Sequence, residues 1–393
     1  MRTPLAWKNL TASWGKCLLA ATGVGFAVVL MFMQTGFRNA LIDSNVQLFS
    51  LFDLSQANVA VFSRARYNLA SELRYPRDTL DVLAAMPEVK QVGTVSIERG
   101  TATVQVRGLQ ARPIRVLALD KAAQEFLAEP ALREQLLEAD RQGACLIAQD
   151  SKPFYGFADT AEKVRLQPIE LNGRALKATG LFRLGTDFGN DGTLLMSQRQ
   201  HSQYFPWRSP TGRPEDLVDL AFLKVEPLPG RTIEQVMQQI QLLAPHLLEV
   251  RTTSGLAQRE KDFWSKATPV GKIFFIGTMM GLIVGAIICY QIQFTDINDH
   301  MSEFATLKAM GYSSGYFWRF ILSQSFFLAC LGFLPGWLAS YAMYSLLSHY
   351  SGLVMMMTWD RVLLVWCLTL AMCIFSGGLA IRKLFRSDPA SLF

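Results

Sequence analysis

Four long apolar stretches interrupt a chain of otherwise mixed character. Residues 17–33, 273–290, 320–347 and 362–381 carry no charged side chain, and the third stretch contains Pro335 and Gly336. A helix needs roughly 20 mostly apolar residues to cross about 30 Å of hydrocarbon. The pattern therefore predicts four transmembrane helices, which we place at 17–38, 270–292, 317–347 and 361–382.

The segment 39–265, between the first two predicted helices, has the mixed, periodic pattern of a globular domain. Residues 89–120 alternate apolar and polar side chains and are broken by Gly100 and Gly108, which predicts consecutive strands. Other predicted strands cover 144–148, 163–182, 193–196 and 218–225, and predicted helices cover about 76–87, 121–140 and 231–243. The predicted fold is an α-helical membrane bundle of four transmembrane helices with a large α+β extracytoplasmic domain between helices 1 and 2.

Positively charged residues flank the two outermost predicted helices. They are Arg2, Lys8 and Lys16 before the first helix, and Arg382, Lys383 and Arg386 after the fourth. Lys and Arg close to membrane helices favour the cytoplasmic side, so both termini are predicted to be cytoplasmic. Residues 1–16 are predicted to form an interfacial helix, and 383–393 a cytoplasmic tail. The loop 293–316 is then cytoplasmic, whereas 39–265 and the short loop 348–360 lie outside.

Composition fits a membrane protein and excludes other classes. Charged residues make up 18% of the chain, against roughly 25% in soluble domains. The net charge of +6 comes without a basic cluster interleaved with aromatic residues, so no nucleic acid is a predicted partner. Of six cysteines only Cys145 lies in the 39–265 insert, which therefore forms no internal disulfide. No Cys/His cluster has the spacing of a zinc site, and no metal or cofactor is predicted.

Motifs of hydrolytic enzymes fail here on their context. A P-loop needs G-x-x-x-x-G-K-[ST], but neither Gly15-Lys16 nor Gly271-Lys272 has the upstream glycine or the following Ser or Thr. The G-x-S-x-G match that begins at Gly311 follows a polar helical segment and precedes a membrane span. A hydrolase would need a strand, a sharp turn and a helix there. The chain is therefore predicted not to be an enzyme.

Glycines recur at four-residue intervals in two of the predicted spans. The second span carries Gly277, Gly281 and Gly285, and the third carries Gly332 and Gly336. Residues four apart share one helix face, and small residues there let another helix approach closely in lipid. We predict that these faces pack against another helix, either a span of the same chain or a second copy of it.

The loop 293–316 contains an amphipathic pattern that begins at Asp296, a suitable N-cap, and ends at Gly311, a typical helix stop. Its apolar residues, at four- and three-residue steps along one helix face, are Ile297, Met301, Phe304 and Leu307. Glu303 and Lys308 fall largely elsewhere. The pattern fits a helix lying on lipid, and equally a helix that docks a soluble cytoplasmic partner. The acidic residues mildly favour docking, because the lipid surface attracts Lys and Arg.

This loop resembles the cytoplasmic motif of FtsX/MacB-type ABC transporter permeases, which has the form E-R-x-x-E-I-G-x-x-[KR]-A-x-G. The chain matches the motif at Glu303, Lys308, Ala309 and Gly311, and departs from it at His300, Phe304 and Ala305. Segments similar to the DevC-type branch of the family are EKDFWSKATPVG (260–271), ATLKAMGY (305–312), LGFLPGW (331–337) and RSDPASLF (386–393). The order of one span, a large domain and three further spans also resembles this family.

The resemblance implies a permease subunit of a tripartite ABC exporter in a bacterial inner membrane. A separate cytoplasmic ATPase would dock on the helix at about 296–310, against its apolar face. The 39–265 domain would engage a periplasmic membrane-fusion (adaptor) protein that continues to an outer-membrane channel, and two permeases would form a homodimer. Conformational change driven by the ATPase would be transmitted to that domain to drive export. The DevC-type branch is associated with glycolipids, so a glycolipid or another amphiphile is the implied cargo.

Two alternatives share this layout. One is a membrane-anchored regulator or scaffold of an envelope enzyme, similar to FtsX, and the other is a lipoprotein-release permease. The partners distinguish them, because an ATPase with an adaptor favours export and a peptidoglycan hydrolase favours regulation. The residues themselves do not name the exported substrate.

Overall fold

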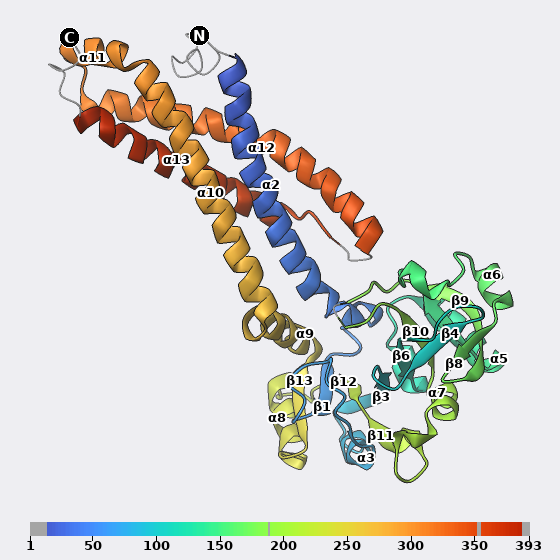
Figure 1. Ribbon diagram of the computed structural model, residues 1–393. Coiled ribbons are helices and arrows are strands. Elements are labelled where there is room, and N and C mark those ends of the chain that lie inside the picture. The colour runs from blue at the N-terminus through green and yellow to red at the C-terminus, as the bar shows by residue number, and fades with distance from the viewer. Residues whose placement is uncertain (1–13, 188, 352–354, 387–393) are drawn as a thin grey trace. The chain divides into compact units, whose positions relative to one another are not determined.

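The computed structural model describes residues 14–187, 189–351 and 355–386 (Figure 1). These residues divide into two compact units. The first, which we call the membrane unit, comprises 14–40, 268–350 and 355–386, and the second, the insert domain, is essentially 41–267. Most of the interfacial helix predicted at 1–16 and of the tail predicted at 383–393 lies outside the described residues.

Long helices make up the membrane unit. They are α2 (Trp14–Ser44), α10 (Pro269–Asp299), α12 (Ser314–Ser351) and α13 (Trp359–Arg386), with the short α11 (Met301–Ala309) between α10 and α12. Among the described residues, four helices are long and apolar enough to cross a membrane, which confirms the predicted bundle. Pro335 does not break α12. Proline is tolerated inside membrane helices because neighbouring groups satisfy the freed backbone.

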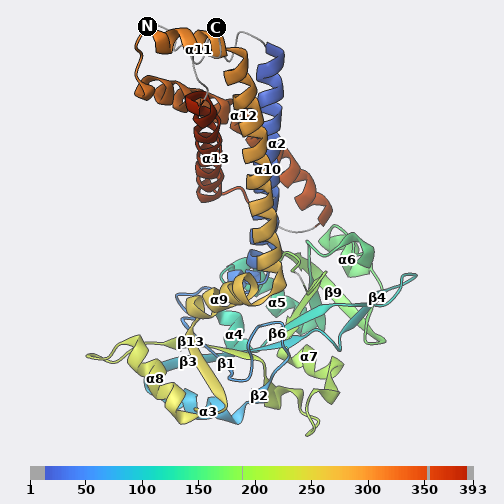
Figure 2. The same ribbon diagram turned by 60° about the vertical axis from the view of Figure 1, so that its left-hand side comes forward.

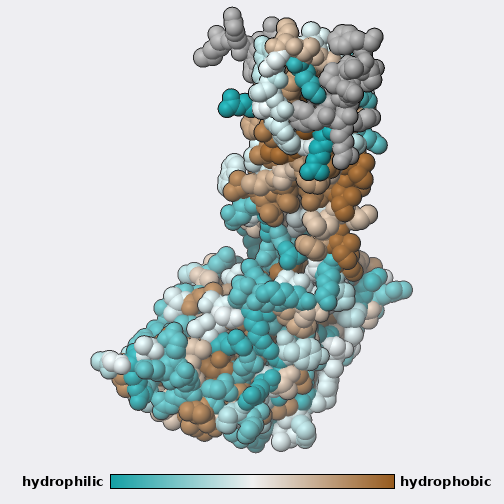
Figure 3. Space-filling model, turned by 90° about the vertical axis from the view of Figure 1, so that its left-hand side faces the viewer, coloured by the Kyte–Doolittle hydropathy of each residue, from teal (hydrophilic) through white to brown (hydrophobic). Residues whose placement is uncertain are grey.

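The surfaces of the two units differ in kind. Figure 3 shows a band of brown, apolar side chains over the helices of the membrane unit, whereas the visible face of the insert domain is mostly teal and white. Large apolar side chains that point outward from the helices include Ile276, Met280, Ile283, Leu338 and Leu363. This distribution is expected where lipid is the solvent. The chain is a membrane protein.

The insert domain is built on one large twisted sheet (Figures 1 and 2). Within the described residues its eleven strands run in the spatial order β13 (Leu248–Thr252), β1 (Val59–Ser63), β12 (Leu220–Val225), β3 (Val89–Glu98), β6 (Arg115–Leu119), β10 (Thr193–Ser197), β7 (Ala144–Ala148), β9 (Arg174–Phe182), β8 (Ile169–Leu171), β4 (Thr103–Val106) and β5 (Arg112–Pro113). The pairs β6–β10 and β7–β9 are parallel, and the other pairs are antiparallel. A separate pair joins β2 (Tyr75–Pro76) to β11 (Leu217–Val218).

Short helices accompany these strands. The α-helices are α3 (Asp78–Ala84), α4 (Lys121–Glu125), α5 (Pro130–Gln142), α6 (Ala161–Leu166), α7 (Gln198–Tyr204), α8 (Ile233–Leu243) and α9 (Thr253–Asp262). The 3-10 helices are η1 (Gln47–Leu51), η2 (Pro153–Tyr155), η3 (Pro206–Arg208) and η4 (Pro214–Asp216), and η5 (Phe263–Ala267) is a π-helix.

Alternation along the strands sends side chains into cores on opposite faces of the sheet. In β1, Val59 and Val61 pack in a core that α3 and α8 cover, while Ala60 and Phe62 pack on the other face with α4, α5 and η1. This second core continues across to β6, β7 and β10, and a third core lies under β4, β8 and β9. One face therefore carries a shared core and the other carries two separate cores, so the predicted α+β domain has two lobes.

Several predicted elements of the insert domain differ from the structure at their boundaries. Pro76 belongs to β2, and the helix predicted from this residue begins only at Asp78. The helix predicted at 121–140 is two helices, because Pro130 starts a new one at its first position, where proline needs no backbone donor. The segment predicted as strands at 163–182 begins with the end of helix α6.

Candidate functional site

The loop between the second and third spans folds as a short helix of its own (Figure 2). Asp296 is not its N-cap, because α10 continues to Asp299 and the backbone breaks at His300, with φ −106° and ψ 19°. Ile297 therefore belongs to α10, whereas Met301, Phe304 and Leu307 lie on α11. The break arises where the run of residues with good helix propensity meets the polar stretch around Asn298, Asp299 and His300.

The apolar face of this segment is covered by the chain's own spans. Ile297 and Phe304 are buried in a cluster with α12 and α13, whose members are Phe317, Phe320, Ile321, Ala380 and Ile381. The ring of Phe304 lies edge-on to those of Phe317 and Phe320, with centroid distances of 6.0 Å and 5.5 Å. Met301 and Leu307 are partly buried against the same cluster. Phe304 retains an exposed fraction of only 6%, so in this structure it is not available to a partner.

The opposite face of α11 is open. Its exposed residues are Ser302, Glu303, Thr306, Ala309 and Met310. Met310 is 63% exposed and Tyr312, just beyond the helix, is 46% exposed. Gly311 ends the helix with φ +88°, a left-handed conformation that glycine adopts without strain. We name these five residues, four of α11 and Met310 directly after its last residue, the outer face of α11.

Buried polar side chains tie the three helices together beneath α11. Gln293 of α10 donates from Nε2 to the Cys373 carbonyl of α13 at 3.1 Å and accepts at Oε1 from Ser325 of α12 at 3.0 Å. Gln324 of α12 donates to the Asp296 carboxylate of α10. Buried polar groups whose hydrogen bonds are all made favour a single packing arrangement of the helices that carry them. These bonds therefore fix the register of the helices that carry α11.

The glycines predicted to pack against a helix do so within this chain. A Cβ added at Gly285 would lie 2.6 Å from Cβ of Ala27, and one at Gly332 would lie 2.4 Å from Cβ of Val24, both on α2. A Cβ at Gly336 would lie 2.8 Å from the Gly25 carbonyl. Gly277 faces Gln34, and Gly281 faces Leu30 and Met31, again on α2. In this structure both glycine faces lie against the first span of the same chain, and Gly285 also lies against Met372 of α13, whose Sδ would be 2.4 Å from the added Cβ.

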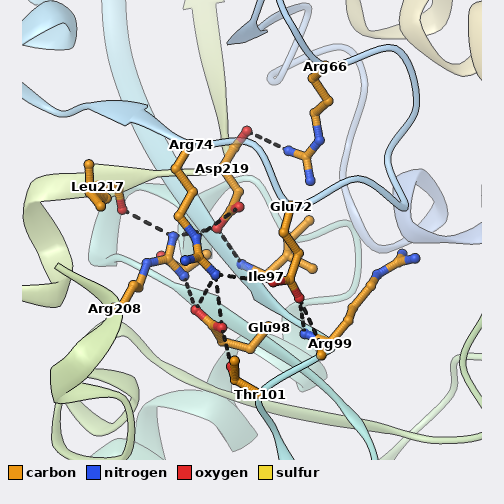
Figure 4. A network of polar contacts seen from close by, with 12 residues as sticks. Arg66, Glu72, Arg74, Ile97, Glu98, Arg99, Thr101, Arg208, Leu217 and Asp219 are labelled. Atoms are coloured by element: carbon orange, nitrogen blue, oxygen red, sulfur yellow. Dashed lines mark hydrogen bonds and ion pairs between the residues drawn. The ribbon is translucent and has the colours of Figure 1, made fainter.

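A buried network of charged side chains lies in the insert domain (Figure 4). Arg208 donates to Glu98 at 2.6 Å and to Asp219, and its side chain and that of Asp219 are fully buried. Arg74 donates to both oxygens of Glu98, at 3.0 Å and 2.9 Å. Asp219 also accepts from the Ile97 amide at 2.9 Å. The network therefore joins the end of β3 to the loop before β2, to η3 and to the start of β12.

The protonation of this network is set by its burial and its partners. Burial alone raises the pKa of Glu98, but the hydrogen bond from His201 and the charges of Arg208 and Arg74 outweigh burial and lower the pKa to about 2. Burial lowers the pKa of His201, which is fully buried and stacks on Phe205 at 4.7 Å. Glu98 is therefore ionised and His201 neutral near pH 7.

Two aspartates of a glycine-rich segment, Asp187 and Asp191, are held by basic partners. Asp187 bonds to Arg115 and accepts from the Asn190 side chain at 2.7 Å. Asp191 pairs with Lys152 at 2.5 Å. Each carboxylate therefore has a protein partner, as loop residues in ion pairs do.

Comparison with known proteins finds a family match within the membrane unit. Residues 274–389 match the family described as FtsX-like permease C-terminal, and this match includes α11 and the last two spans. This part of the chain is similar to an FtsX-like permease domain.

Solved structures resemble the insert domain at low identity. The periplasmic region of MacB from Actinobacillus actinomycetemcomitans is 8% identical, with 52% of this chain and 92% of that chain covered and a TM-score of 0.35. The extracellular domain of the noncanonic ABC-type transporter YknZ from Gram-positive bacteria is 10% identical, with coverage of 49% and 100% and a TM-score of 0.32. A domain of a putative permease protein from Porphyromonas gingivalis is 13% identical, with coverage of 51% and 91% and a TM-score of 0.32. No curated protein matches the chain.

The sequence predicts a helix in the loop where α11 lies, but it does not predict the buried network of the insert domain. His201 belongs to this network, because its Nε2 lies 3.5 Å from both Glu98 Oε1 and Arg208 Nη1. Arg74, Glu98 and Asp219 lie far apart along the chain, so no spacing brings them together. One signal was present, because Glu98 and Asp219 each adjoin a strongly apolar strand, where an unpaired carboxylate would be costly.

Proposed function

We propose that the permease transmits motion between a separate cytoplasmic ABC ATPase, docked on the outer face of α11, and its own insert domain outside the cell membrane. One observation carries the proposal: α11 is fixed to the spans along one face and open along the other. A helix that transmits motion from a partner protein to the spans must be held rigidly to the spans and must expose a surface that the partner can bind.

Two sets of contacts hold α11 and the spans together. Phe304 interlocks with two rings of α12, and the hydrogen bonds of Gln293 and Asp296 below it hold α10 to α12 and α13. A displacement of α11 would therefore move several spans together, and would not be limited to bending at the connection between α11 and the spans. α10 begins at Pro269, directly after the π-helix η5 of the insert domain, so the same helix connects the two ends along the chain.

The outer face has the chemistry of a protein-docking surface. It presents an apolar side chain at Met310, small or hydroxyl side chains, and a carboxylate at Glu303. A face designed for an anionic lipid surface would carry Lys and Arg instead. The residues predicted from the family motif, Glu303, Lys308 and Gly311, lie on or beside this face. Docking therefore uses the face opposite to the apolar one expected from periodicity.

The finer parts of the proposal rest on the resemblance of the sequence. Both termini and α11 face the cytoplasm, in line with the basic residues near α2 and α13, and the membrane is a bacterial inner membrane. Two permeases form the homodimer, the insert domain engages a membrane-fusion adaptor that leads to an outer-membrane channel, and the cargo is a glycolipid or another amphiphile, as in the DevC-type branch.

The test is a charge on the outer face with a matched control elsewhere. Burying a side chain of the size of Met310 contributes about 1.5–3 kcal/mol, so Met310→Asp should weaken ATPase binding at least about tenfold. The control is Met356→Asp, because Met356 is 61% exposed against 63% for Met310 and lies after the far end of α12. ATPase recovery with the tagged, detergent-solubilised permease is measured by mass spectrometry and then with the purified partner.

We expect the wild type and Met356→Asp to recover an ABC ATPase, and Met310→Asp to lose it while remaining in the membrane. Equal recovery by wild type and by a Thr306→Arg, Met310→Asp double variant would contradict docking on this face. Recovery of a peptidoglycan hydrolase on the insert domain, without an adaptor, would contradict export and favour the regulator.

A further inference from the structure

We propose that a cavity in the insert domain binds a small organic anion, one that joins a phosphate or carboxylate group to an apolar or aromatic body. The cavity has a volume of about 240 Å³. Residues of β5, the start of β6, η2 and the 189–191 turn line it, and its side chains include Arg99, Arg112, Arg115, Phe154, Tyr155 and Asp191. We call it the arginine cavity. The site is independent of the ATPase and of the docking face on α11.

Two of the charges around the arginine cavity are already used. Arg115 is buried, bonds to Asp187 and donates from Nε to the Thr193 hydroxyl at 3.0 Å. The lining carboxylate, Asp191, pairs with Lys152 at 2.5 Å. Neither of these two ion pairs includes the other two lining guanidinium groups.

Arg99 and Arg112 are those remaining groups. In the described part of the chain neither guanidinium donates to a carbonyl or a carboxylate, and Nε of Arg99 is buried without a hydrogen-bond partner. Figure 4 shows the side chain of Arg99 extending away from Glu98 and Asp219, with no bond drawn from its guanidinium. Half-buried cations without acceptors are costly, and a bound oxyanion would supply the missing acceptors in the bidentate geometry that guanidinium favours.

The positive charge of Arg99 affects the pKa of another arginine that lines the cavity. Burial lowers the pKa of the Arg115 guanidinium to about 10, Asp187 opposes this effect, and the nearby charge of Arg99 adds to it. Since Arg99 repels Arg115 across the same cavity, an anion placed between them would be attracted by both. Low-dielectric walls concentrate this attraction at the cavity.

The walls select for an organic rather than a bare inorganic anion. Cζ of Arg112 lies 4.5 Å from the centroid of the Phe154 ring, and that ring is 39% exposed. Tyr155 is buried behind it and donates its hydroxyl to the Pro113 carbonyl, so it offers the cavity its ring and not a free donor. Ile114 and Pro113 complete an apolar side. A ligand body can stack on Phe154 while its anionic group meets Arg99 and Arg112.

Arg99 also connects the cavity to the buried network. Its backbone amide donates to Glu72 at 2.7 Å, and Glu72 lies 3.6 Å from Arg74, which holds Glu98. A ligand that restrains Arg99 therefore restrains the end of β3 and the loop before β2. Binding should stiffen the junction of the two lobes of the insert domain.

The experiment is calorimetric titration of the full-length permease in non-ionic detergent with inorganic phosphate, phenyl phosphate, benzoate and dihexanoyl phosphatidic acid. We expect saturable binding of phenyl phosphate, at least tenfold tighter than inorganic phosphate. Arg112→Gln and Arg99→Gln should each weaken it at least tenfold, and Arg112→Lys should weaken it less than Arg112→Gln. The control Arg141→Gln, at a position with 79% side-chain exposure, should leave binding unchanged.

The outcomes separate the possible sources of the anion. Tighter binding of the phosphatidic acid than of phenyl phosphate supports a lipid headgroup, and the reverse supports a soluble ester. Binding of inorganic phosphate as tight as that of phenyl phosphate refutes the role of Phe154 and the apolar wall. Absence of saturable binding for all four probes, or equal loss in Arg141→Gln, overturns the site. Arg112 makes no hydrogen bond from its side chain in the described structure, so Arg112→Gln reports on the site without breaking the fold.

Discussion

The variant Arg208→Met should lower the free energy of unfolding of the insert domain by about 3 kcal/mol. Methionine fills much of the same space but supplies no donor and no charge. Arg208 is fully buried and bonds to two carboxylates of the network, Glu98 at 2.6 Å and Asp219. Removing it leaves two buried negative charges beside one another with one cation fewer.

The magnitude follows from the partners that remain. Breaking a buried ion pair by removing one member costs about 3–5 kcal/mol, because the other member stays buried and unpaired. Here Glu98 keeps both bonds to Arg74, at 3.0 Å and 2.9 Å, and Asp219 keeps the Ile97 amide at 2.9 Å. Each carboxylate keeps a hydrogen-bond partner, so we expect a loss of stability at the lower end of that range.

The insert domain contains its own reporter for the assay. Cys145 is the only cysteine in the sequence between residues 41 and 267, and it is fully buried in β7. A maleimide reagent can therefore label it only when the domain opens, and the labelling rate follows the population of open molecules when closing is fast. A loss of about 3 kcal/mol corresponds to a labelling rate about a hundredfold higher. Peptide mass spectrometry separates Cys145 from the cysteines of the spans.

Arg141→Met is the matched control, because Arg141 lies on α5 with 79% of its side chain exposed and pairs with Glu138 only at 3.8 Å. Exposed pairs of this kind contribute about 0–1 kcal/mol, so its labelling rate should stay within about fivefold of the wild type. If Arg208→Met also stays within fivefold, the network does not hold the domain together and the reasoning is refuted.

Two further predictions concern helix packing and pH. Gly285→Ala should destabilise the membrane unit by about 1–3 kcal/mol, because the added Cβ would lie 2.6 Å from Cβ of Ala27. Gly281→Ala should be tolerated, because the nearest contact of its added Cβ is at 3.5 Å. Thermal unfolding of the two variants in detergent tests this prediction, and equal melting temperatures contradict it. The folded pKa values of His201 and Glu98 lie below their ordinary values of 6.5 and 4.5. The folded state therefore binds fewer protons, and stability present above pH 6.5 should fall as pH drops, first through His201 and then below about pH 4.5 through Glu98. Urea midpoints measured at pH 7, 6, 5 and 4 by intrinsic fluorescence check the sign, and a midpoint that rises on acidification contradicts it.

The spans and the α+β character of the insert could be predicted because both depend on local pattern. A run of about 20 apolar residues can only be buried in lipid or in a large core, and alternation along 89–120 can only place side chains on two faces of a sheet. The boundary errors at Pro76 and Pro130 have the same local origin, since proline is compatible with both the ends of strands and the first turn of helices.

Tertiary structure decided everything that depends on which distant segments meet. The period of Met301, Phe304 and Leu307 predicts an apolar face, but only the folded chain shows that α12 and α13 cover it and leave Met310 outside. The five glycines predict close helix contacts, but their spacing is the same whether α2 or a second copy is the neighbour. Glu98 and Asp219 are 121 positions apart in the sequence, and the residues next to one do not predict contact with the other. Amphipathic pattern is a property of a segment, whereas burial and ion pairing are properties of a pair of surfaces, and the second member of each pair is chosen by the fold.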